Sequence, residues 1–372
     1  RAARLPEVTG SAGATFTDNP AQTAVLGGGG ALEIYSASVG ISSFELDLFG
    51  RVRNLSRAAQ EQYFASEEGE RAARISLIAE IANAWLALAS DQEQLQLAQQ
   101  SLQTWDETRK LTRAQFDVGS TSELESRQAD AQYQSARNDL AVLQSRVLQD
   151  RNALDVLVGA PIADELLPAG LPTEGASLPM VPSQLPSDLL LARPDVIQAE
   201  RLMLAQDANL GAARAAMFPS ISLTGSGGSQ SLALSDLFSK GSYFYQGGPT
   251  LNLPIFDFGR RKAGVAVAKA QREAAMATYE KAIQTAFREV ADALAQRSTI
   301  DERVEAQTAR ADSARVAADL AEARYKQGAS SFLQALDARR TDYAARQQRV
   351  QTGLDRELNR IALYRTLGGG LR

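Results

Sequence analysis

The chain has 372 residues, a net charge of −5, and neither cysteine nor histidine. Without these two residue types the sequence excludes a disulfide framework, a Cys/His nucleophile site and a zinc site. The acidic balance argues against a nucleic-acid partner, which demands a basic footprint. No apolar run approaches the length of about 18 residues that a membrane-spanning helix needs, so none is predicted.

Residues 1–50 are poor in charge and rich in Gly, Ser and Thr, and they predict a β-hairpin. Apolar residues alternate with Ser, Thr and Gly over 8–17 and again over 35–42, which is the period of a strand. The stretch 18–30, which ends in four glycines, predicts the loop between them. The chain opens without Met in a sequence similar to 213–219, so we expect it to be truncated at its N-terminus.

Residues 51–158 predict a pair of long helices. The run 51–118 is rich in Ala, Gln, Glu, Arg and Leu, and contains no Pro. At about 1.5 Å per residue this helix would be roughly 100 Å long. Gly119 and the three hydroxyl residues after it break the run, and a second helix is expected over 123–157. Helices this long and polar do not make a globular core, so we expect a coiled coil or a wall of helices.

The amino-acid composition changes in the middle of the chain. Residues 159–193 are rich in Pro and Gly and predict an irregular linker. Pro194 lies near the first turn of the helix expected over 194–217.

Beyond this point the first half of the chain recurs as an internal duplication. The tripeptide Phe-Gly-Arg at 49–51 returns at 258–260, an offset of 209 residues that also relates Gly119 to Gly328. This register holds without a gap over about a hundred residues, which indicates a repeat rather than chance similarity. The repeat is far longer than a solenoid unit, so we expect a ring of units. A second hairpin is expected at 218–258, a second helix pair at 259–367 and a tail at 368–372.

The strands admit two interpretations, a hairpin lying on a soluble core or one spanning a membrane. The polar face of Ser, Thr, Gly and Asn, the aromatic residues near the ends and the length of about ten residues favour a membrane. Four strands cannot close a barrel, and open edges are not tolerated in lipid, so the chain must oligomerise. Two copies would give a filled barrel, whereas three would give twelve strands and an open pore.

Four segments resemble the outer-membrane factor family, the TolC/OprM-like exit ducts of tripartite drug-efflux pumps. These segments are residues 44–51, 191–195, 211–220 and 282–287. The resemblance spans the chain and is closest to the lipoprotein branch that works with RND transporters. It implies a homotrimer with a twelve-stranded β-barrel in the outer membrane, a twelve-helix α-barrel in the periplasm and an equatorial belt.

The resemblance also implies partners and a place for each segment. The partners would be an inner-membrane RND transporter, a periplasmic adaptor (membrane fusion) protein and outer-membrane lipid, with no cofactor, no metal and no enzymatic activity. That branch begins with a lipidated Cys, which this chain lacks. The hairpins 1–50 and 218–258 would form the membrane barrel, the helix pairs 51–158 and 259–367 the periplasmic barrel, and 159–193 and 368–372 would belong to the equatorial belt.

In the family, the inner helices of the second copy close the periplasmic end of the duct. The constriction maps onto Leu333, as an apolar ring, and Asp337, as a ring of three carboxylates. Arg324 and Tyr325 match positions that tie neighbouring helices together, and their acidic partner in the first copy maps onto Glu125. The turns at the tips of the two helix pairs are Gly119 and Gly328. Ser330 and Gln334 replace charged residues of some relatives, so closure is expected to use fewer charged ties.

Each of these residues also has an ordinary structural interpretation. Asp337 on a charged helix would by itself be a solvated surface residue, although its counterpart in the first copy is the neutral Gln128. Tyr325 is matched by Phe116 and would be a packing aromatic, and Leu333 would be a core residue.

Rival functions are a soluble helical scaffold or adaptor protein and, more distantly, an enzyme. Within the family, the rivals are an outlet for type I secretion or for metal-ion export.

Overall fold

The computed structural model describes residues 4–17, 32–172 and 188–369. The expected loop at 18–30, the linker residues 173–187 and both chain ends, 1–3 and 370–372, lie outside them. The chain divides into two compact units, one formed by Arg1–Glu68 with Ile197–Ala282 and the other by Gly69–Val196 with Ile283–Arg372.

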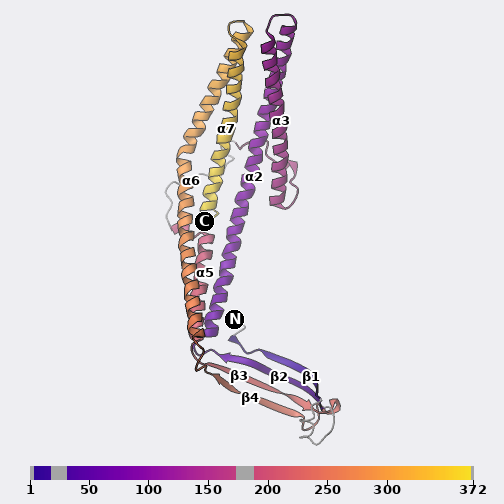
Figure 1. Cartoon of the computed structure of the whole chain (residues 1–372), viewed down its shortest axis with the longest axis vertical. Coiled ribbons are helices and arrows are strands. Elements are labelled where there is room, and N and C mark those ends of the chain that lie inside the picture. The colour runs from indigo at the N-terminus through magenta and orange to yellow at the C-terminus, as the bar shows by residue number, and fades with distance from the viewer. Residues whose placement is uncertain (1–3, 18–31, 173–187, 370–372) are drawn as a thin grey trace. The chain divides into compact units, whose positions relative to one another are not determined.

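The first unit contains one antiparallel sheet of four strands in the order β1-β2-β3-β4 (Figure 1). Both expected hairpins are present, and β2 pairs with β3, which joins the two copies of the repeat into one sheet. The β2–β3 register shifts between Ile41 and Phe44. The strands are β1 (Val8–Thr17), β2 (Leu32–Leu46), β3 (Ser220–Ser231) and β4 (Tyr243–Asn252).

The two faces of the sheet differ as the alternation predicts. Val39 and Tyr245 stand in one cross-strand row, on either side of Gly227, and are 58% and 93% exposed. The adjacent row, on the other face, is polar and runs through Thr9, Gly40, Ser226 and Gln246. A Cβ at Gly40 would lie 2.5 Å from the carbonyl oxygen of residue 225, so close strand approach requires glycine there. The sheet therefore exposes an apolar face.

Helices α2 (Arg51–Asp117) and α6 (Arg260–Lys326) begin directly after Gly50 and Gly259, whose φ angles are 79° and 84°. Within the first unit, α5 (Pro194–Ala215) packs against both long helices. Arg201 on α5 forms an ion pair of 3.2 Å with Glu61 on α2, and Asp207 on α5 one of 2.5 Å with Arg272 on α6.

In the second unit, α3 (Glu123–Val158) folds back along α2, and α7 (Phe332–Thr366) folds back along α6 (Figure 1). All five long helices lie within about two residues of their expected bounds, because glycines punctuate an otherwise uninterrupted helical sequence. The core between the pairs is built from Trp105 of α2, Ala129 and Ala136 of α3, and Phe332 and Leu336 of α7.

The described part of the linker is not wholly irregular. It contains a short 3-10 turn, η2 (Asp164–Leu166), and a short helix, α4 (Asp188–Leu191). Its backbone is held along α2, where Trp85 donates to the carbonyl oxygen of Leu166 at 3.1 Å and Gln96 to that of Ala169 at 3.2 Å.

One helix in the described part of the chain, α2, is long and apolar enough to cross a membrane by length and composition, with an 18-residue window of mean hydropathy 1.4. This finding differs from the sequence prediction, which looked for an uninterrupted apolar run. A single window of this kind is weak evidence for a span. In α2, Ala79 and Leu86 pack against Leu354 and Ile361 of α7, and 22% of the window is buried within the chain.

Candidate functional site

The tips of the two helix pairs are built alike. Gly119 and Gly328 each follow a long helix in the left-handed conformation, both with φ of 72°. Each glycine N–H donates to a carbonyl three residues back at 2.9 Å, and the next residue donates five residues back at 2.8 Å. This is a Schellman cap, which satisfies the last carbonyls of the helix.

Tyr325 on α6 lies at the contact between the two helix pairs. Its ring packs against Phe332 of α7 with the centroids 5.4 Å apart, and its hydroxyl donates to Oε1 of Gln115 on α2 at 3.4 Å. Burial and the negative charge of Glu125 raise the pKa of Tyr325. The structure therefore places Tyr325 near Glu125, with Gln115 as its hydrogen-bond partner.

The other two expected ties are arranged differently. Glu125 accepts a hydrogen bond from the hydroxyl of Thr121, in its own turn. Arg324 is exposed, and among the described residues its side chain is not hydrogen-bonded to Tyr325 or Glu125.

Gln115 and Thr121 were missed by the sequence analysis. The repeat offset of 209 residues points to both positions, because Gln115 and Thr121 are the first-copy counterparts of Arg324 and Ser330.

Leu333 and Asp337 share one face of α7, since they are four residues apart. Leu333 is 60% exposed and Asp337 is also exposed, whereas the residues directly before them, Phe332 and Leu336, are buried on an adjacent face of the helix. Leu333 is thus not a core residue of its own chain. This apolar and acidic face is turned away from the protein interior.

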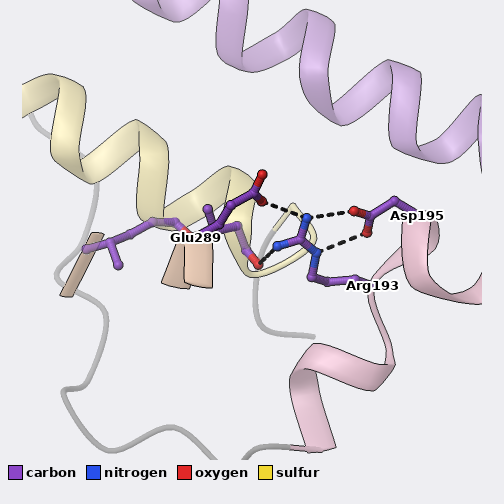
Figure 2. Close-up of polar contacts among 5 residues, drawn as sticks. Arg193, Asp195 and Glu289 are labelled. Carbon is purple, nitrogen blue, oxygen red and sulfur yellow. Dashed lines mark hydrogen bonds and ion pairs between the residues drawn. The ribbon is translucent and has the colours of Figure 1, made fainter. Parts of the chain in front are cut away.

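The carboxyl end of α7 is held by a buried arginine (Figure 2). The guanidinium of Arg193, whose side chain is 8% exposed, donates to Asp195 at 3.0 and 2.7 Å and to Glu289 of α6 at 2.9 Å. Its remaining nitrogen donates to the carbonyl oxygen of Thr366 at 3.1 Å. One side chain thereby joins the start of α5, the middle of α6 and the end of α7.

The electrostatics of this cluster favour its charged form. Burial alone would raise the pKa of Asp195, but hydrogen bonds from Arg193 hold it below the usual range. Leu190, Val290 and Leu367 form a small apolar cluster in the same unit. The Arg-Pro-Asp segment at 193–195 was predicted from the sequence to start a helix and contributed to the family resemblance, but this bridging role was not predicted.

Comparison with known proteins agrees with this architecture. The family model described as "Outer membrane efflux protein" matches residues 1–160 and 185–369. The chain belongs to the outer membrane efflux protein family. It is therefore a transport protein of the bacterial outer membrane and not an enzyme.

Two relatives and one solved structure illustrate the range of the family. The chain is 40% identical over 370 residues to the solvent efflux pump outer membrane protein SrpC of Pseudomonas putida, which covers 100% of this chain and 78% of SrpC. It is 38% identical to the cation efflux system protein CusC of Escherichia coli, over 88% of this chain and 71% of CusC. The open state of the Neisseria gonorrhoeae MtrE outer membrane channel superposes with a TM-score of 0.86 at 38% identity, over 100% of this chain and 82% of MtrE.

Proposed function

We propose that this chain forms the outer-membrane exit duct of a tripartite multidrug efflux pump, as a passive homotrimeric channel. The observation that carries the proposal is the four-stranded sheet with an exposed apolar face and two edge strands, β1 and β4. Such a sheet needs lipid on its apolar face and further strands at its edges. Three copies supply twelve strands, which is enough to enclose a pore.

The domain assignment follows from the same argument. Residues 1–50 and 218–258 form the membrane barrel, and the helix pairs 51–158 and 259–367 form the periplasmic barrel. The linker 159–193 and the tail 368–372 belong to the equatorial belt, beside the helix 194–217. The partners in this proposal are a periplasmic adaptor protein and an inner-membrane RND transporter.

The gate of the duct lies at the tip of the second helix pair. Leu333 and Asp337 share an exposed face of α7, as a lining residue must. Threefold symmetry brings three copies of Asp337 around one axis, where the ring of negative charge attracts cations. Tyr325 and Glu125 stabilise the closed state. Gln115 is the direct hydrogen-bond partner of the tyrosine, and Arg324 faces the neighbouring protomer.

The cargo is chosen by the transporter, and we propose drug-like molecules as the main class. The chain is about equally similar to a solvent efflux protein and to a cation efflux protein, at 40% and 38% identity. Metal-ion export is therefore the second candidate function.

The gate is tested on the detergent-solubilised protein, whose mass must first correspond to three chains. In planar bilayers the wild-type channel is expected to be cation-selective and blocked by trivalent cations added from the periplasmic side. Asp337→Asn removes the carboxylate ring, so both the block and the selectivity are expected to disappear while the trimer persists.

Gln128→Ala is the matched control, because Gln128 is the neutral counterpart of Asp337 in the first copy, and its block should equal that of the wild type. An unchanged block in Asp337→Asn would place the constriction elsewhere, with Leu333 as the next residue to vary. A water-soluble monomer would overturn the duct itself.

A further inference from the structure

A small polar cavity lies between α2 and α7, beyond the gate residues along α7. It has a volume of about 50 Å³ and is lined on α2 by Gln100, Ser101 and Thr104 and on α7 by Asp342 and Tyr343, among others. Asp342 is only 6% exposed. A cavity of this size holds water when two or more polar groups face it.

Three buried polar atoms of residues that line the cavity have no hydrogen-bond partner in the described part of the chain. They are Oδ1 of Asp342, the hydroxyl of Tyr343 and Nε of Arg339. Buried polar atoms are almost always paired, so water in the cavity would supply the missing partners. A buried carboxylate that depends on water rather than on a fixed cation is a poor place for a permanent charge.

Two of the cationic neighbours of Asp342, Arg346 and Arg339, already have other partners. Arg346 on α7 donates to Oε1 of Gln100 on α2 at 3.0 Å, and Arg339 forms ion pairs with Glu322 and Asp319 of α6.

The groups around Asp342 shift its pKa in opposite directions. Burial raises the pKa of Asp342, Arg346, Arg339 and Arg315 lower it, and Asp319 raises it. From α3, Asp139 raises the pKa of the adjacent Tyr343, for which burial is the larger cause.

The repeat shows that this arrangement is particular to the second copy. Tyr133, 209 residues before Asp342, packs its ring beneath the guanidinium of Arg109, which lies 4.3 Å from the ring centroid. The counterpart of Arg109 in the second copy is Ala318. The cation–π pair of Arg109 and Tyr133 in the first helix pair is thus replaced by an alanine and a buried acid in the second.

We propose that Asp342 and this cavity form a proton-sensitive contact between α2 and α7, which holds the two helices together when the carboxyl group is neutral and loosens them when it ionises. The direction follows from linkage. The packed arrangement holds the proton more tightly than an arrangement that exposes Asp342 to water, so acid favours packing. Each unit of difference in pKa between the two arrangements changes their ratio about tenfold.

The contact itself is tested by distance measurement, without reference to conduction. The chain has no native cysteine, so spin labels can be placed at two exposed positions, through Gln103→Cys on α2 and Ala344→Cys on α7. Trimers diluted with unlabelled chain report the distance within one protomer. We expect a narrow distribution at about pH 4.5 and a broader, longer one at about pH 8, across the range in which a raised carboxyl titrates.

Asp342→Asn keeps the shape of the side chain and cannot ionise, so its distribution is expected to stay narrow at both pH values. Asp301→Asn, which removes an exposed carboxylate from α6, is the matched control and should respond as the wild type does. The proposal is overturned if the wild type shows no pH response, or if Asp342→Asn retains the full response.

The consequence for the channel rests on the proposed function and is measured separately, in an Asp337→Asn background that removes the carboxylates of the gate ring. Open probability is expected to rise severalfold from about pH 4.5 to about pH 8, and Asp342→Asn should abolish the rise. A pH-dependent distance change without any conductance would refute the duct and leave the contact standing. Conductance without the distance change would refute the proton-sensitive contact and leave the duct standing.

Discussion

The two ends of α7 are held by different kinds of interaction. At its carboxyl end the carbonyl oxygen of Thr366 accepts from Arg193, a buried cation that also binds two carboxylates. At its amino end Ser331 makes no side-chain capping hydrogen bond, and Leu333 and Asp337 are exposed. Charge-assisted hydrogen bonds are about twice as strong as neutral ones, so the polar interactions of α7 are stronger at its carboxyl end, whereas its amino end is held mainly by the apolar packing of Phe332 and Leu336.

The first helix pair shows that a weak amino end is not inherent in the repeat. Ser122 caps α3 by accepting from the backbone N–H of Glu125 at 3.3 Å, and Thr121 donates to the carboxylate of Glu125. Their counterparts Ser331 and Ser330 lack these bonds, and the hydroxyl of Ser330 has no partner among the described residues. From this difference we expect movement at the tips to involve the start of α7 rather than the start of α3.

The largest effect is expected at the anchored end. Arg193→Ala leaves Asp195 and Glu289 without their cation and should lower the free energy of unfolding by about 3 kcal/mol. This value is near the lower end for a broken buried pair, because Asp195 is 44% exposed. Denaturant unfolding of the detergent-solubilised protein measures the loss. Arg193→Lys should recover only part of it, since lysine lacks the planar fork, and a loss below about 0.5 kcal/mol would refute the anchor.

An intermediate effect is expected at the two tip glycines, which the repeat makes a matched pair. A Cβ at Gly119 or Gly328 would meet nothing within 4 Å, so an alanine costs only the left-handed backbone, about 1–2 kcal/mol. Hydrogen exchange of the amides in each turn should show the same loss of protection in Gly119→Ala and Gly328→Ala. Channel opening should increase only in Gly328→Ala, because α7 follows that turn. Equal gains in conductance would contradict the assignment of movement to α7.

The smallest effect is expected at the loosely held end. Tyr325→Phe removes one hydrogen bond to Gln115, worth about 0.5–1.5 kcal/mol, and the distance of 3.4 Å places it at the lower limit. Single-channel recording should show a modest rise in open probability. Gln115→Ala should have a similar effect, and the double variant should add little, because both changes remove one contact. Full additivity would show that the two side chains do not interact in the trimer.

Much of the fold was predictable from local sequence. The glycines at 50, 119, 259 and 328 set the bounds of the long helices to within about two residues, because a glycine interrupts a helix locally. The alternation located the strands but not all of their ends: it was predicted over 35–42, whereas β2 runs over Leu32–Leu46. Pairing of β2 with β3 was not predicted, since nothing local specifies which hairpins meet.

The candidate site was predictable only in part. Family resemblance located Leu333, Asp337 and Tyr325, and their roles in the gate stay predictions. The partner of Tyr325, Gln115, lies 210 residues away along the chain, and only its place as the first-copy counterpart of Arg324 pointed to it. The bridging role of Arg193 depends on Glu289 and Thr366, which the sequence separates by many turns of helix. Asp342 could have been singled out from the sequence, because it is an acid at a position where the first copy has Tyr133.

The pairing of β2 with β3, which forms the seam between the two copies of the repeat, affects the order in which parts of the chain fold. Each hairpin closes over a short stretch of chain, whereas the seam pairs Tyr35 with Ser231, about 200 residues apart. Contacts that far apart form late and slow folding, because the entropy of closing the intervening chain is lost first. The hairpins and helix pairs are therefore expected to form before the seam. A chain interrupted within the linker should yield two fragments that reassemble through this strand pair and through the contacts between the two helix pairs.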